Sequence, residues 1–241
     1  MYHSIEAIVL RLVRHNDKHS IVRLYTPALG VIGCVTPAGD SREARRRRAL
    51  MTPLATLRCV VSMTQGSDLH HLRDVQPLDM SAASILTSPV KGALAQFLAE
   101  LFDATLREQQ PDALLYDFVA HTARELSAIG GGGANYHLLV LLRLGHFQGI
   151  EPDWGSYRRG YWLDESDGTF RPVPPMHEHF ADPRESRVLY LLHSLPADKL
   201  SRLRLSARDR NYIIDRILAY YRLHEVNTGP LHSLEVLRQL F

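Results

Sequence analysis

The chain has 241 residues, of which 45% are hydrophobic and 22% are charged, and its formal net charge is +2. These values exclude wholesale disorder, and the length suits one large or two small domains. The charge is unevenly placed, because residues 1–80 hold eleven Lys and Arg against seven Asp and Glu, whereas the remaining residues carry a net charge of −2. A basic front part on a nearly neutral chain indicates a local anionic partner.

The apolar segments favour neither a membrane span nor a secretory signal. No run approaches the roughly 18 apolar residues that a spanning helix needs, and the first segment, "MYHSIEAIVLRLVRHND", carries Glu6 and Arg11 inside its apolar part. The only two cysteines, Cys34 and Cys59, each lie in a strand-like setting, where two buried thiols are favoured over a disulfide. A cytoplasmic protein is therefore expected.

Residues 3–78 carry the signals of β-strands. Five segments are rich in β-branched and aliphatic residues: "IEAIVLRLV", "SIVRLYT", "GVIGCVT", "ATLRCVVSM" and "HHLRDVQPL". Turn-like stretches at 27–30, 37–40 and 66–68 separate them. Five short strands with turn signals favour a small closed or partly open barrel of OB type over a parallel sheet.

Helical spacing replaces this pattern after residue 80. Ser88 and Pro89 start a first long helix, Pro111 and Asp112 start a second, and "ANYHLLVLLRLGHF" is an almost wholly apolar third. The glycines at 130–133 read as a linker, because the Lys and Ser/Thr of a phosphate-binding loop do not follow them. Further helices are expected at about 185–194, at 207–224 after a Ser206 cap, and from Ser233 onward.

An irregular stretch interrupts the helices at 149–184, where "DESDG" predicts a hairpin tip. The sequence therefore predicts an α+β fold. A five-stranded OB-type barrel covers residues 1–80, and an all-helical domain with this insertion covers residues 81–241.

Positive charge is concentrated in "SREARRRRALMTP" at 41–53, which lacks apolar periodicity and follows "PAGD", so a loop is expected. A merely solvated charge run is the alternative interpretation. In a small barrel, strand faces and loops can form a groove that takes phosphates on Lys and Arg and bases on apolar faces. The predicted DNA-binding residues are Arg11, Arg14, Lys18, Arg23, Arg42, Arg45, Arg46, Arg47 and Arg48.

Aromatic residues are scarce in this basic part. Tyr2 and Tyr25 are the only ones in the first 80 residues, and Tyr25 is expected in the barrel core rather than as a stacking platform. Binding dominated by the phosphate backbone and indifferent to base sequence is therefore expected.

Catalytic and metal-binding patterns are weak. The "HEH" at 177–179 and the pair His70–His71 lack the spacing of a metal site, and Asp17, Asp40 and Asp74 form no recognisable carboxylate motif. No nucleophile elbow is present. The sequence therefore predicts no catalytic residue, no metal ligand and no cofactor. A metal-dependent hydrolase at His177 and His179 is kept as the least favoured alternative.

The order of several segments resembles that of the bacterial RecO family of DNA-repair and recombination proteins. The resembling segments are "EAIVLRLVRHNDKHSIVRLYTPALGVIGCV", the basic segment with "LMTPLATL", "SPVKGALAQFLAELF", "LLRLGHFQGIEPD", residues 220–224 and the closing "HSLEVLRQLF". Each segment alone is degenerate, but together they run nearly end to end. Many members of the family carry a four-cysteine zinc site in the insertion, whereas residues 149–184 contain no cysteine here. We expect a metal-free hairpin with a small core of Tyr157, Tyr161 and Trp162.

This resemblance implies a non-enzymatic recombination mediator. Such a protein binds single- and double-stranded DNA and anneals complementary strands. It also engages the acidic C-terminal tail of the single-stranded-DNA-binding protein and acts with RecR to load RecA. The tail needs an apolar groove beside a cation, for which Arg124, Arg143 and Arg216 are unranked candidates. The alternative function is an interaction scaffold whose basic segment docks an acidic protein without DNA.

Overall fold

The computed structural model describes residues 2–63, 66–67, 69–106, 111–130 and 133–240. The chain divides into two compact units. The first comprises Met1–Ala128 and Leu231–Leu237, and the second comprises Ile129–Pro230 and Arg238–Phe241. The domain boundary expected at residue 80 stays a prediction. Within the described ranges, no helix combines the length and hydrophobicity that crossing a bilayer requires.

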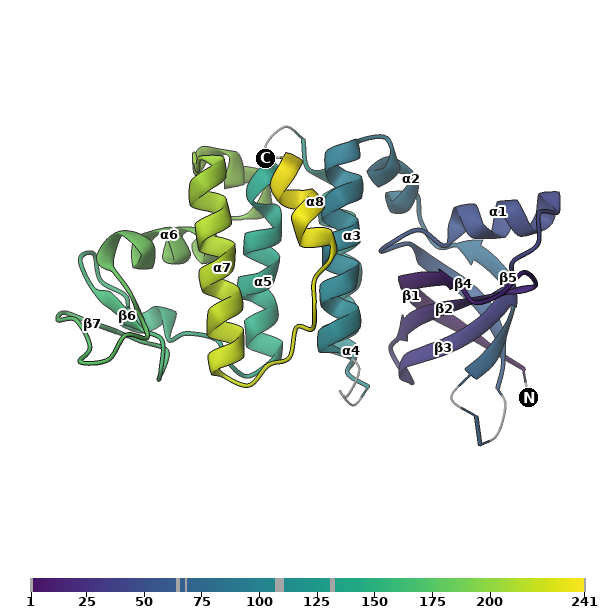
Figure 1. The fold of residues 1–241 in the computed structure, drawn as a ribbon, viewed down its shortest axis with the longest axis horizontal. Coiled ribbons are helices and arrows are strands. Elements are labelled where there is room, and N and C mark those ends of the chain that lie inside the picture. The colour runs from purple at the N-terminus through teal and green to yellow at the C-terminus, as the bar shows by residue number, and fades with distance from the viewer. Residues whose placement is uncertain (1, 64–65, 68, 107–110, 131–132, 241) are drawn as a thin grey trace. The chain divides into compact units, whose positions relative to one another are not determined.

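Five strands of the first unit close into a barrel (Figure 1). They follow one another around it in the order β1-β2-β3-β5-β4, and β3 and β5 are the parallel pair among otherwise antiparallel neighbours. The predicted α+β class with an N-terminal OB-type barrel is thereby confirmed. The strands are β1 (Tyr2–Arg14), β2 (His19–Thr26), β3 (Gly30–Pro37), β4 (Thr56–Ser62) and β5 (Leu69–Pro77).

The strand β1 is buried on both faces in its middle. Ala7 and Val9 belong to the cluster of apolar side chains inside the barrel. Ile8 and Leu10 alternate with them and are also buried, and the helix α3 (Pro89–Thr105) packs against this strand. An uninterrupted apolar run is what a strand covered on both sides requires. Both cysteines, Cys34 and Cys59, are free and buried in the interior of the barrel, as expected.

The expectation of a loop at the arginine-rich segment is wrong, because residues Arg42–Leu50 form the helix α1 between β3 and β4. The side chain of Ser41 accepts a hydrogen bond from the backbone N–H of Ala44 and caps the helix. Arginine has a high helix propensity, and Arg47 and Arg48 in the last turn suit the negative end of the helix dipole. Ala44 is the only buried residue of α1, so no apolar stripe marked the helix in the sequence.

Helices complete the first unit, and the predicted starts of two of them are confirmed. Ser88 caps α3 through the N–H of Lys91, and Asp112 accepts hydrogen bonds from the N–H groups of Leu114 and Leu115 at the next long helix. The other helices with residues in this unit are α2 (Ser81–Leu86), α4 (Ala113–Ala128) and the beginning of α8 (Ser233–Leu240).

Three α-helices and a small sheet dominate the second unit. Capping boxes start two of the helices, at Asp182 with Glu185 and at Ser206 with Asp209, the second as predicted. The predicted linker at 130–133 lies partly outside the described residues. The helices are α5 (Tyr136–Phe147), α6 (Pro183–Ser194) and α7 (Ala207–Leu223), with 3₁₀ turns at Gly133–Asn135, Trp154–Ser156 and Ala197–Arg202.

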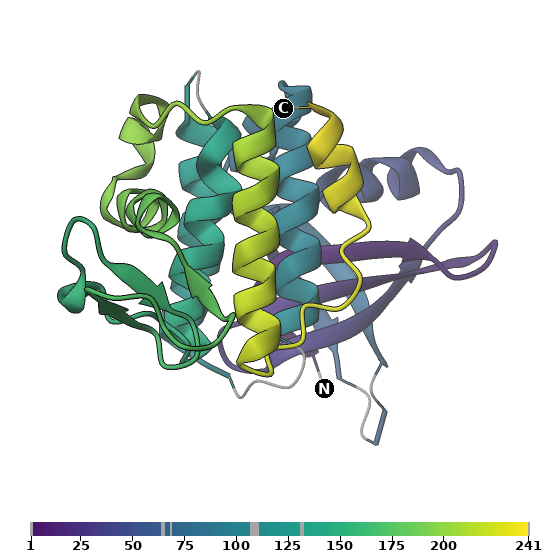
Figure 2. The same cartoon turned by 60° about the vertical axis from the view of Figure 1, so that its left-hand side comes forward.

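The insertion forms the predicted hairpin, seen in Figure 2 beside α6. Strands β6 (Trp162–Asp164), β7 (Thr169–Arg171) and β8 (Phe180–Ala181) make the sheet. The ring of Tyr157 stacks on Tyr190 of α6, and the ring of Trp162 meets Phe180 edge-on. Aromatic packing of this kind stabilises a segment too short to bury a core of its own.

Candidate nucleic-acid interface

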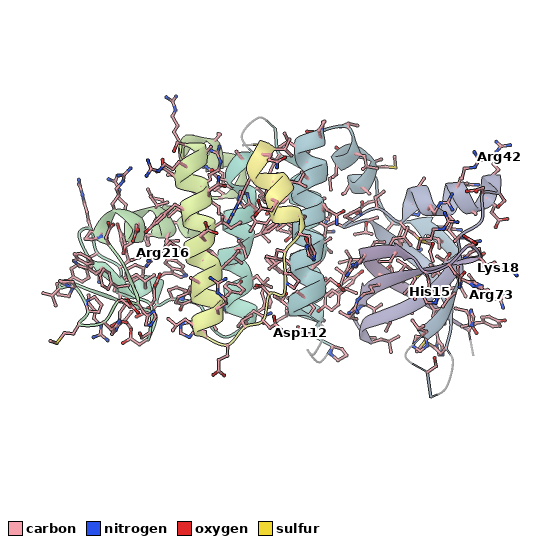
Figure 3. The ribbon with its side chains drawn as sticks, viewed as in Figure 1. His15, Lys18, Arg42, Arg73, Asp112 and Arg216 are labelled. Atoms are coloured by element: carbon pink, nitrogen blue, oxygen red, sulfur yellow. The ribbon has the colours of Figure 1, made fainter. Side chains whose placement is uncertain are left out.

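Several cations predicted to bind DNA lie at one end of the barrel. Figures 1 and 2 both show the tip of the β1–β2 hairpin and the helix α1 at this end. Figure 3 shows Lys18 of the hairpin, Arg42 of α1 and Arg73 of β5 there. We call this region the basic end of the barrel. Its cations come from three elements that are separated in the sequence.

The hairpin is held in place by hydrogen bonds of its own turn. The side-chain oxygen of Asn16 accepts from the backbone N–H groups of Lys18, at 2.9 Å, and His19, at 2.8 Å. The N–H of Ala38, just before α1, donates to the carbonyl of Lys18 at 2.9 Å. The hairpin and the start of α1 are therefore tied to each other.

Some of the predicted arginines already have partners within the chain. Arg14 pairs with Asp17 at 3.1 Å, and Arg47 pairs with Glu43 one turn earlier in α1 at 3.0 Å. The guanidinium of Arg48 donates to the carbonyls of Ala38 and Gly39 and lies 3.4 Å from Asp40, and Arg45 Nε donates to the Asp40 carbonyl. These contacts hold α1 against the segment before it.

Arg23 is occupied in a different way. Its Nε lies 2.5 Å from Oδ1 of Asp103 on α3, a side chain only 4% exposed. A buried carboxylate needs such a partner, because an isolated charge in the interior is costly. The ion pair favours a role for Arg23 in holding α3 on the barrel.

Other cations are free. The side chains of Arg11, Lys18, Arg42 and Arg46 are exposed and make no hydrogen bond or ion pair with another residue in the described part of the chain. Charges that are solvated and unpaired within the chain are available to an external anion. These four are the best-placed of the predicted contacts.

A groove of about 490 Å³ opens in the barrel where β3 and β5 cease to pair after Val35 and His71, and its lining includes His19 and Arg47, the chain neighbours of Lys18 and Arg46. Its walls combine cations with apolar side chains. The residues lining it are His19, Val35, Thr36, Pro37, Arg47, His71, Leu72, Arg73 and Asp74. No local pattern marks His19, His71 and Arg73 as site residues. The antiparallel pairing of β2 with β3 brings His19 to the groove, and the parallel pairing of β3 with β5 brings His71 and Arg73 there beside Arg47.

The two tyrosines of the barrel differ in exposure. Tyr25 is buried, although against the helices rather than in the expected barrel core, and its ring packs against Tyr116 of α4 with ring centroids 5.8 Å apart. Burial, aided by the negative charge of Asp112, raises the pKa of Tyr25 to about 12. Tyr2 is 62% exposed, and the guanidinium carbon of Arg73 lies 5.4 Å above its ring centre. Tyr2 is therefore the barrel tyrosine that a nucleobase can reach.

The three candidate arginines for a partner tail lie in different settings. Arg124 is exposed on α4 of the first unit, whereas Arg143 and Arg216 lie on α5 and α7 of the second. Arg216 lines a mostly apolar pocket with Leu141, Ile150 and other residues, and pairs with Glu165 at 2.7 Å. Burial raises the pKa of Glu165, and the charge of Arg216 opposes that shift.

The histidine clusters gather too few ligands for a metal. His71 faces outward at the groove, whereas His70 is buried opposite Cys34. His177 lies 3.2 Å from the buried Asp164, which also pairs with Arg171 at 3.3 Å. Over the residues that the structure describes, no group of three or more His, Cys, Asp or Glu side chains could hold a metal ion.

A closed OB-type barrel with a basic end, followed by helices, defines a class of proteins to which many nucleic-acid-binding domains belong. Comparison with known families is consistent with this class. The family model "Recombination protein O N terminal" matches residues 1–81, and "Recombination protein O C terminal" matches residues 86–235. The chain belongs to the RecO family.

Curated relatives match this chain over nearly its full length. The DNA repair protein RecO of Porphyromonas gingivalis is 32% identical, covering 98% of this chain and 97% of its own. The DNA repair protein RecO of Azobacteroides pseudotrichonymphae is 26% identical over the whole of both chains. That of Phocaeicola vulgatus is 29% identical over 97% of each. Membership of this family assigns the chain a role in DNA repair and recombination.

Proposed function

We propose that this protein is a non-enzymatic recombination mediator whose barrel binds single- and double-stranded DNA. The observation that carries the proposal is the set of unpaired, exposed cations at the basic end beside an open groove. Phosphate contacts from Arg and Lys supply most of the sequence-independent affinity for DNA. The nine predicted cations remain candidates. Arg11, Lys18, Arg42 and Arg46 rank first because they are free, and Arg23 ranks last because it is paired with Asp103.

Annealing follows from the same charges. Two complementary strands repel each other through their phosphates, and cations that neutralise both backbones lower the free energy of their approach. Because the contacts are to phosphates, binding is indifferent to base sequence. The protein needs no catalytic group or cofactor for this activity.

Family membership supports a proposal about the protein's partners. We propose that the protein binds the acidic C-terminal tail of the single-stranded-DNA-binding protein and acts with RecR to load RecA on coated DNA. The three candidate arginines stay unranked, because the apolar pocket at Arg216 holds only about 20 Å³ and Arg216 is paired with Glu165. Capture of these partners from purified mixtures tests this part, and failure to bind any of them would refute it.

The salt dependence of DNA binding tests the main proposal. If about four single-strand phosphates are engaged, log affinity falls against log salt with a slope of roughly −3. The double variant Arg42→Ala, Arg46→Ala keeps a helix-favouring residue at both positions and reduces the magnitude of the slope by about 1.4. The measurement is fluorescence anisotropy of a labelled oligonucleotide at several salt concentrations.

Arg58→Ala is the matched control, because Arg58 is an exposed barrel arginine that is paired with Glu6 instead of being free. We expect that variant to keep the wild-type slope. An unchanged slope in the double variant would mean that the arginines of α1 are merely solvated charges without a DNA contact. Absence of any complex at low salt would favour the interaction scaffold.

A further inference from the structure

Strand register places one row of residues across the whole barrel. Val13 of β1 is paired with Ile21 of β2, Ile21 with Val35 of β3, and Val35 with His71 of β5. The row continues from His71 to Ser62 of β4 and from Ser62 to Tyr2 at the start of β1. Directly paired residues on neighbouring strands project from the same face of a sheet. We call these six residues the cross-strand row.

The cross-strand row lies on the outer face of the barrel. Val13 is 43% exposed and Tyr2 is 62% exposed, and Val35 and His71 line the groove. The adjacent row points inward, since Val22 and Cys34 are fully buried in the barrel core. Four of the six residues in the outer row are thus apolar or aromatic side chains on a surface that faces solvent.

Cations border this row on both sides. On one side of the row lies Arg11, two residues before Val13 in β1. On the other side lie Lys18 and His19, which precede Ile21 at the start of β2. Arg47 and Arg73 reach the middle of the row at the groove. Apolar side chains flanked by cations fit a single nucleic-acid strand, which presents bases on one side and phosphates on the other.

Tyr2 and Arg73 form a ready stacking site at one end of the row. The guanidinium of Arg73 lies over the ring of Tyr2, and Arg73 also lines the groove. Aromatic rings and arginine planes are the groups on which proteins stack unpaired bases. One side chain therefore connects the groove with the aromatic platform.

We propose that the cross-strand row is the track along which the bases of a single strand lie, ending on the Tyr2–Arg73 platform. This inference rests on the proposed DNA-binding function and names the residues that contact bases. Neighbouring strands are about 4.8 Å apart, so the row spans about 24 Å. That length suits the smallest site sizes known for such barrels, about four nucleotides.

Base contact by this row distinguishes single strands from duplexes. A duplex keeps its bases stacked inside the helix and offers only its phosphates and groove edges, so it cannot use the platform. The arginines of α1 contact phosphates of both forms. The cross-strand row therefore makes the protein prefer single strands, and α1 does not.

The test compares variants of exposed side chains in the full-length protein. We expect Tyr2→Ala to lower the affinity for a short labelled single strand about tenfold, the loss typical of one stacked base. Its affinity for a duplex hairpin and its salt slope stay at wild-type values, because no phosphate contact is removed. Tyr2→Phe retains single-strand affinity. Leu29→Ala, at an exposed apolar residue in the β2–β3 turn, is the matched control and changes neither affinity.

A second measurement locates the base directly. An oligonucleotide carrying iodouracil is irradiated in the complex, and we expect the crosslinked peptide to contain Tyr2. Equal single-strand affinity in Tyr2→Ala and wild type, with the crosslink elsewhere, would overturn the track and leave the DNA-binding function intact. Failure of the wild-type protein to bind any oligonucleotide would overturn both.

Discussion

The ion pair of Arg23 and Asp103 shows how one contact changes the role of a residue. By composition Arg23 is one more cation on a basic strand, but its guanidinium lies against a nearly buried carboxylate of α3. Removing one partner of such a pair costs more free energy than the pair itself contributes, because the remaining charge loses its solvent and its counterion together. We therefore expect Arg23 to contribute more to the stability of the first unit than to DNA binding.

This difference can be measured. We expect Arg23→Ala to lower the free energy of unfolding by about 2 kcal/mol while leaving the salt slope of DNA binding unchanged. Replacing both partners with leucine restores most of the stability, because no unpaired charge is left. Arg58→Ala, which breaks an exposed pair with Glu6, costs less than about 0.5 kcal/mol. A stable Arg23→Ala protein with a flatter salt slope would show instead that Arg23 contacts phosphates.

At the scale of the element, α1 converts a run of like charges into an oriented surface. In a loop, five arginines could adopt many directions, whereas the helix points Arg42 and Arg46 outward and Arg48 toward the carbonyls before it. Residues four apart share a helix face, so Arg42 and Arg46 lie one above the other. The helix is held by its cap and by arginine contacts, since it buries only Ala44.

Removal of the cap should therefore loosen α1 locally. We expect Ser41→Ala to cost about 1 kcal/mol of helix stability, so the amide of Ala44 and its neighbours in α1 exchange about fivefold faster with solvent hydrogen. The measurement is native-state hydrogen exchange by peptide mass spectrometry. Ser206→Ala, at the cap of α7, is the control and accelerates exchange in α7 alone. Unchanged exchange in α1 would mean that the arginine contacts suffice without the cap.

At the scale of the whole molecule, a buried histidine makes the second unit sensitive to acid. His137 of α5 lies fully buried in the second unit, and burial together with the charge of Arg210 lowers its pKa from 6.5 to about 3. Between these values the unfolded chain binds a proton that the folded chain does not, so stability falls as the pH falls through this window. Above pH 6.5 the contribution of His137 to stability is constant.

The tryptophans make this testable, because Trp154 and Trp162 are the only two and both belong to the second unit. We expect urea unfolding followed by tryptophan fluorescence to show a loss of about 2 kcal/mol from His137 when the pH drops from 7 to 5. A His137→Gln variant lacks the titrating group, so its free energy of unfolding falls correspondingly less between pH 7 and pH 5. The same pH dependence in variant and wild type would show that His137 is not the cause.

Local patterns in the sequence were sufficient for most of the elements. Alternation and turn residues predict the five barrel strands, and the caps at Ser88, Asp112 and Ser206 mark helix starts that the structure retains. These signals depend on residues within one or two turns of each other, so they can be read without the fold. The sequence did not predict the helix α1, because its stability comes from arginine propensity and a cap rather than from an apolar stripe.

The sequence by itself determined the order of elements, the family resemblance and the concentration of positive charge before residue 80. Only the tertiary structure decided which cations are free, since Arg23 and Asp103 meet across 80 positions of the chain. It also decided the groove and the cross-strand row, because these depend on the pairing of β3 with β5 and of β1 with both β2 and β4. Non-local register is a property of the closed barrel, and no local pattern encodes which residues it brings side by side.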